Sequence, residues 1–105
     1  MTLIMTIPEV PGHQIDRVLG VVTAESVQGV NIVKDVFAAV RDVVGGRSAT
    51  LENMLRQCRD DCMRELDENA RRMGADAVVG LRSDYFSANN MMILTLMGTA
   101  VTLRR

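Results

Sequence analysis

Two cysteines carry the most distinctive chemistry of this 105-residue chain. Cys58 and Cys62 are spaced by one helical turn, so on a helix they would share a face. Two thiolates placed in this way can bind a soft ion such as Zn²⁺ or Cu(I), although two ligands do not complete a tetrahedral shell. His13 is the single histidine, and it could complete the shell only if folding or a second copy of the chain brought it close. A soft metal ion is therefore the one cofactor candidate that the sequence offers.

The same cysteines also fit the interior of the protein. They continue an apolar stripe with Leu55, Leu66 and Ala70, and a buried free cysteine behaves as a small hydrophobic residue. Geometry disfavours a disulfide within one helix. The eight methionines are soft ligands too, but their spacing places them on the same stripe or on strand faces. We therefore favour core packing over metal binding for these sulfur-containing residues.

A glycine-rich segment, Gly45-Gly46-Arg47-Ser48, is the second candidate site. A glycine pair, an arginine and the free amides of a helix N-terminus together suit an anion such as a phosphate or a carboxylate. In the simpler interpretation, which we prefer, the glycines end one helix, Ser48 caps the next, and Arg47 is held by Asp42 or Glu52. The segment lacks the length and the lysine of a P-loop, so nucleotide hydrolysis is not indicated.

Composition and motifs argue against several classes of function. The serines lack a local general base, and Glu25, Asp76 and Asp84 are isolated carboxylates, so we expect a protein that is not an enzyme. A net charge of -1 and 3% aromatic residues argue against a nucleic-acid partner. The longest apolar stretch, 91–103, is shorter than the roughly 20 residues that span a bilayer, so we expect no membrane partner. The first residues lack a basic signal region, which favours a cytoplasmic location.

A single domain, residues 1–105, must position these side chains. In chain order we expect strands at 2–7 and 14–24, helices at 32–44 and 48–73, and strands at 77–86 and 91–103. The turn-forming cluster at 8–13 predicts that the first two strands pair, or that one of them is an edge strand. Residues 87–90 predict the turn of an antiparallel hairpin. The fold class is thus α/β (α+β), a two-layer sandwich of β-β-α-α-β-β order with a mostly antiparallel sheet.

The helix at 48–73 has the clearest pattern. Its apolar residues recur every three or four positions, and Gly74 predicts its end. On the other face, acidic residues precede basic ones by four positions, which predicts exposed ion pairs: Glu52 with Arg56, Asp60 with Arg64, Asp67 with Arg71, and Glu68 with Arg72.

The strand at 91–103 predicts self-association. Its odd positions include Ile93, Met97 and Val101, and its even positions include Leu94 and Leu96, so both faces are apolar. Two helices can cover only one face of a sheet, and a second copy of the chain is the obvious cover for the other. We expect a homo-oligomer whose interface is built by the strand faces and the first helix. Its polar contacts would come from these residues: Arg41, Asp42, Arg47 and Glu52.

Several blocks of sequence resemble the YbjQ-like family over nearly the whole chain. The blocks are Gly20-Val21-Val22-Thr23, Gly29-Val30-Asn31-Ile32, Arg41-Asp42-Val43-Val44-Gly45-Gly46-Arg47-Ser48, Gly74-Ala75-Asp76-Ala77-Val78-Val79-Gly80, Asp84-Tyr85 and Gly98-Thr99-Ala100-Val101. The chain departs from the family pattern at Ala24, where a glycine is usual, and at Leu51, where a tyrosine is usual. The family pattern has no cysteines at the positions of Cys58 and Cys62, so the resemblance does not support them as ligands.

The resemblance implies a small bacterial or archaeal cytoplasmic protein that assembles into a homopentamer. It also carries the description "putative heavy-metal-binding domain", with no activity attached. We therefore expect a non-enzymatic, homo-oligomeric structural or ligand-binding module. Binding of a soft heavy-metal cation is the first alternative, and anion binding at the turn of residues 45–48 is the second.

Overall fold

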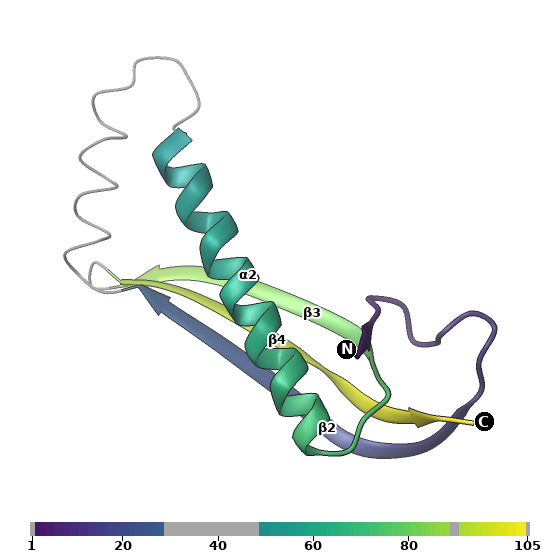
Figure 1. Ribbon diagram of the computed structural model, residues 1–105. Helices are drawn as coiled ribbons and strands as arrows, with labels where there is room; N and C mark the ends of the chain where they lie inside the picture. The colour runs from purple at the N-terminus through teal and green to yellow at the C-terminus, as the bar shows by residue number, and fades with distance from the viewer. Residues whose placement is uncertain (1, 29–48, 89–90, 105) are drawn as a thin grey trace.

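One mixed sheet and one helix account for the regular structure in the described residues, which are 2–28, 49–88 and 91–104 of a computed structural model. In chain order the elements are β1 (Leu3–Ile4), β2 (Ile15–Gln28), α2 (Ala49–Arg72), β3 (Ala77–Ala88) and β4 (Met91–Leu103). Helix α2 lies across one face of the sheet (Figure 1). The α+β class and the mostly antiparallel sheet are confirmed. The predicted helix at 32–44 lies outside the described residues.

Strand β4 is central to the sheet. The strand order is β1-β3-β4-β2, and β4 pairs antiparallel with both β2 and β3. Strand β1 adds to β3 in parallel, with Leu3 opposite Ala77. The strands near the N-terminus, β1 and β2, therefore lie at opposite edges, and the predicted pairing of 2–7 with 14–24 is wrong. Both are edge strands.

The residues between β1 and β2 explain this difference. Val10 lies within the turn-forming cluster, yet it is only 4% exposed because it packs against Ala77, Val79 and Val101. These three side chains lie on the sheet face opposite α2. Burial of apolar surface thus draws the cluster across the sheet, where a tight hairpin would have left Val10 in solvent.

Residues 2–7, here called the N-terminal segment, cover part of the outer edge of β3. The backbone N atoms of Gly80 and Leu81 donate to the carbonyl oxygens of Ile7 and Met5 at 2.9 and 3.0 Å. At the start of the segment, Thr2 donates hydrogen bonds to the Asp67 carboxylate from both its backbone N and its hydroxyl, which lowers the pKa of Asp67. This cover ends at Leu81.

Helix α2 buries a row of side chains that are four residues apart, as its sequence predicts. Cys58, Cys62, Leu66 and Ala70 are each no more than 2% exposed. They pack with buried side chains of the sheet: Val22, Ala24, Val78, Leu94, Leu96 and Ala100. The helix ends at Gly74, whose φ of 85° lies in the left-handed region, and Ala75 N donates to Ala70 O at 3.0 Å. The predicted helix at 48–73 is confirmed to within a residue at each end.

The exposed face of α2 differs in part from its prediction. Two predicted pairs form, with N–O distances of 3.9 and 3.6 Å: Glu52 with Arg56 and Asp67 with Arg71. Arg64 pairs with Asp61, three positions away, so its predicted pairing with Asp60 is wrong. Arg72 donates to Asn69 Oδ1 at 3.3 Å and not to Glu68. Positions three and four apart are both neighbours on a helix, so spacing alone does not choose between them.

Candidate functional site

The sheet face opposite α2, here called the far face, carries the most exposed apolar side chains among the described residues. Val18 and Val21 of β2 are 68% and 65% exposed, and Met97 of β4 is 54% exposed. Val27 and Phe86, which flank Ile93 in the register of the sheet, are half exposed. Alternation places Val21 and Val27 on the face that α2 does not touch, and the irregularity between Val18 and Gly20 brings Val18, opposite Val101, onto the same face. A large exposed apolar patch of this kind marks an interaction surface.

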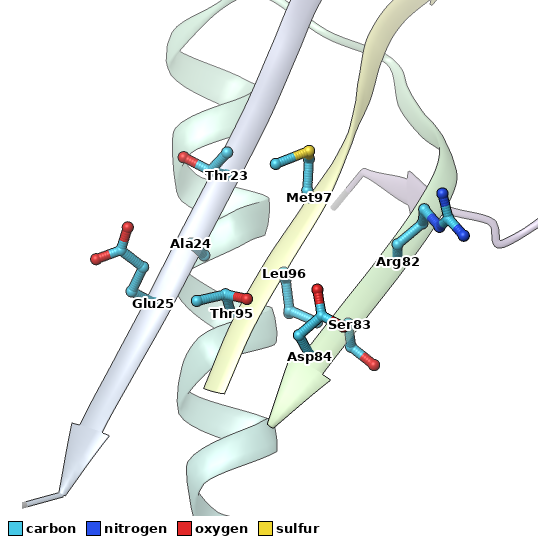
Figure 2. Close-up of a pocket in the computed structure, with 9 residues that line it drawn as sticks. All are labelled: Thr23, Ala24, Glu25, Arg82, Ser83, Asp84, Thr95, Leu96 and Met97. Carbon is cyan, nitrogen blue, oxygen red and sulfur yellow. The ribbon is translucent and has the colours of Figure 1, made fainter. Parts of the chain in front are cut away.

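Two rows of side chains cross the far face and line a hollow of about 570 Å³ (Figure 2). One row, across β2, β4 and β3, is Thr23, Met97 and Arg82. The next is Glu25, Thr95 and Asp84. Three charged groups therefore lie among apolar and hydroxyl side chains in the middle of the sheet.

Glu25 and Arg82 lie on the two outer strands of this three-stranded part of the sheet. Figure 2 shows the carboxylate of Glu25 and the guanidinium of Arg82 each directed away from β4, toward opposite sides. Both side chains are exposed. Within the described parts of the chain, neither one forms an ion pair.

With respect to the described residues, the backbone edges of the same two strands are also open over part of their length. Strand β2 is the outer strand of the sheet at one side, and β3 is covered at the other side only as far as Leu81. A side chain from α2 occupies one position of the β2 edge, because Asn69 Nδ2 donates to the Thr23 carbonyl oxygen at 2.9 Å. Open edges carry backbone N–H and C=O groups that can pair with another strand.

The two cysteines lie on the opposite side of the sheet, in the core beneath α2. Cys58 is 2% exposed and Cys62 is fully buried, with its Sγ 3.9 Å from the Leu94 carbonyl oxygen. Burial raises the pKa of the Cys62 thiol from 9.0 to about 11, with a further contribution from the nearby carboxylate of Glu65. The Cys62 thiol is therefore protonated at neutral pH, and both cysteines are packed among buried apolar side chains.

His13 does not join them. It lies in the exposed stretch that follows Val10, and Val10 packs on the far face. The described residues contain no group of three or more His, Cys, Asp or Glu side chains that could hold a metal ion. The donor set that this part of the chain presents within one copy does not fit a heavy-metal site.

A metal titration tests this conclusion. We expect the reduced protein to take up no equivalent of Zn²⁺ or Cu(I) through its cysteines, because a pKa raised from 9.0 to about 11 lowers the thiolate fraction of Cys62 about a hundredfold. Isothermal titration of the wild type and of the Cys58→Ala, Cys62→Ala double variant should give the same result. One equivalent bound by the wild type and lost in the folded double variant would contradict the expectation.

The other predicted site residues fall mostly outside the described residues. These are Arg41, Asp42, Gly45, Gly46, Arg47 and Ser48. Glu52 lies in the first turn of α2 and contacts Arg56. The roles assigned to these residues at an interface or an anion site remain predictions.

Sequence reasoning did not single out Arg82, and it treated Glu25 and Asp84 as isolated carboxylates. Their register on neighbouring strands depends on the strand order of the whole sheet. A local signal exists nevertheless: Arg82 and Asp84 alternate with other residues on one face of β3, as Glu25 does between Thr23 and Val27 on β2. Charges at such positions interrupt two otherwise apolar strand faces.

These features define a small α+β protein: a four-stranded mixed sheet with a helix on one face and an exposed apolar surface on the other. A protein-family model with the description "Putative heavy-metal-binding" matches residues 2–104. The chain belongs to this YbjQ-like family, which confirms the resemblance seen in the sequence blocks. No helix in the described part of the chain is long and apolar enough to cross a membrane.

A solved structure shares the fold. The chain is similar to a protein of unknown function from Pediococcus pentosaceus that belongs to the DUF74 family, with a TM-score of 0.64 and 18% identity. The similarity covers 98% of this chain and 98% of that one. At this level of identity the match bears on the fold alone.

Proposed function

We propose that the protein is a non-enzymatic homo-oligomer, acting in the cytoplasm as a structural or ligand-binding module. The observation that carries the proposal is the far face, where large apolar side chains are exposed between two strand edges that no other described segment fully covers. Completing the burial of each half-exposed valine, methionine or phenylalanine contributes about 1 kcal/mol. A second copy of the chain is a partner that every such molecule has available.

The two open edges differ from each other, which favours a ring. An interface that joins the β2 edge of one copy to the β3 edge of the next is head-to-tail, and head-to-tail interfaces form closed rings when the rotation closes. Strands β2 and β3 both run antiparallel to β4, so they run in the same direction. In a ring whose axis follows the strands, they would therefore pair in parallel. The family resemblance supplies the number of copies, a pentamer.

The proposal is tested by the mass of the native protein. We expect native mass spectrometry of the wild type to show a homopentamer, and Val21→Glu to shift the protein toward the single subunit. Val21 is 65% exposed, so the subunit should keep its fold, which circular dichroism can check. Asn53→Glu is the matched control, because it adds the same charge on the exposed side of α2 and should leave the mass unchanged. A wild type that stays a single subunit at micromolar concentration would contradict the proposal.

Heavy-metal binding is the second candidate, and the family description is the observation that favours it. Two thiols one turn apart would be its ligands, with His13 contributed by another copy or by rearrangement. The metal titration described above separates it from the first candidate. Anion binding at residues 45–48 is a further candidate, and it predicts that Arg47→Ala weakens phosphate binding while assembly persists.

A further inference from the structure

We propose that Arg82 of one copy forms an ion pair with Glu25 of the neighbouring copy, across a parallel pairing of β3 with the neighbour's β2. The inference rests on the proposed ring and specifies the register in which its edges meet. The site is incomplete within one chain, because the two partners stand on opposite edges of the same sheet.

The charges are placed for a contact between copies. Arg82 and Glu25 are exposed, oppositely charged and directed away from β4, each toward the edge of its own strand (Figure 2). Within one copy β4 separates them, since Arg82 is opposite Met97 and Glu25 is opposite Thr95. When the β3 edge of one copy pairs with the β2 edge of the next in the register that sets Arg82 beside Glu25, these two side chains become neighbours. An arginine and a carboxylate at such an interface fix orientation and register.

The backbone independently selects the same register. On β3 the N-terminal segment occupies the edge as far as Leu81, so the open stretch begins at Arg82. On β2 Asn69 occupies the carbonyl of Thr23, so an uninterrupted stretch begins just after it. Placing Arg82 beside Glu25 in parallel brings these two open stretches together. It also places Thr23, the occupied position of the β2 edge, beside Gly80, which the N-terminal segment already covers.

Other registers conflict with one of these observations. A shift by one residue would put Arg82 and Glu25 on opposite faces, because strand side chains alternate. A shift by two residues would place Arg82 beside Thr23, whose carbonyl Asn69 already holds, or would place Glu25 beside Gly80, which the N-terminal segment covers. The register with Arg82 beside Glu25 satisfies the charges and the backbone together.

Charged residues on edge strands also have an opposite use, because they can prevent strands from pairing. The two interpretations predict different results when the charges are exchanged. If the charges prevent pairing, neutralising or reversing either one leaves the wild-type single subunit unchanged or promotes association. If they form the pair, reversing one weakens assembly and reversing both restores it.

A charge-exchange experiment tests the proposal, using Arg82→Glu, Glu25→Arg and the double variant. Each single variant places like charges across the contact, and we expect its association constant to fall on the order of tenfold or more at low salt. The double variant should assemble within a few-fold of the wild type. Sedimentation velocity over a dilution series measures the association, and circular dichroism verifies folding. Glu65→Arg on the exposed side of α2 is the matched control and should assemble as the wild type does.

The outcomes separate this inference from the proposed function. A wild type that sediments as a single subunit overturns the ring and the pair with it. An assembled wild type whose single variants assemble equally well overturns the pair and leaves the ring intact. Weakened single variants that the double exchange does not restore also overturn the pair.

Discussion

Replacing Leu66 by alanine lowers the free energy of unfolding by about 2–5 kcal/mol, the range expected when a buried leucine is cut back and leaves a cavity. Leu66 is fully buried between Cys62 and Ala70 on the stripe by which α2 packs on the sheet. A domain of this size has a net stability of about 5–15 kcal/mol, so one such change removes a large part of it. Closely packed neighbours relax only partly into the space that the side chain leaves.

Urea unfolding followed by circular dichroism measures the loss, with all proteins at one concentration so that association affects them equally. Leu3→Ala is the matched control, since it is the same chemical change at a leucine that is 46% exposed on β1. We expect the control to lose less than about 1 kcal/mol. Equal losses at the two positions would show that the α2 stripe is not the main core.

Replacing Gly98 by alanine is the second change with a large expected effect, about 1–3 kcal/mol of destabilisation. Gly98 is buried in the central strand, and a Cβ added there would lie 2.6 Å from Val78 Cγ1 and 3.3 Å from the Val79 carbonyl oxygen. Neither neighbour is the flexible end of a long side chain. A β-branched side chain in a packed strand and a backbone carbonyl can give way only by moving β3 relative to β4.

A double-mutant cycle identifies the contact responsible. Val78→Ala removes the methyl group that the new Cβ would meet, so Gly98→Ala should cost less in the Val78→Ala background than in the wild type. Urea unfolding of the four proteins gives the coupling between the two positions. Strictly additive losses would mean that the clash with Val78 does not determine the cost.

The parts of the fold that sequence predicted well have strong local patterns. Helix α2 has a regular apolar stripe, and Gly74 follows its last turn. Residues close together in the sequence therefore determine both the buried face of the helix and its C-terminal end. The pairing of β3 with β4 is likewise local, because the two strands are consecutive and only residues 89–90 separate them in the sequence. Strand β2 runs to Gln28, four residues beyond the predicted end, because β4 is long enough to pair with it there.

The remaining features depend on contacts between distant parts of the chain. The cluster at 8–13 has the composition of a turn whether it joins paired strands or crosses the sheet, and only the burial of Val10 against β3 and β4 distinguishes the two. The same limit applies to the far face. The placement of Arg82 and Glu25 follows from the order β1-β3-β4-β2, which no local pattern specifies.

By pairing with the outer edge of β3, the N-terminal segment also limits which part of that edge another copy of the chain can pair with. With residues 2–7 in place, the backbone of β3 can accept another strand only beyond Leu81, over a stretch too short to slide along its neighbour without breaking the register. Removing those residues would bare the full length of the strand from Ala77. A subunit whose β3 edge is bare over its full length can add copies in more alignments, and such stacking tends toward open fibres rather than closed assemblies.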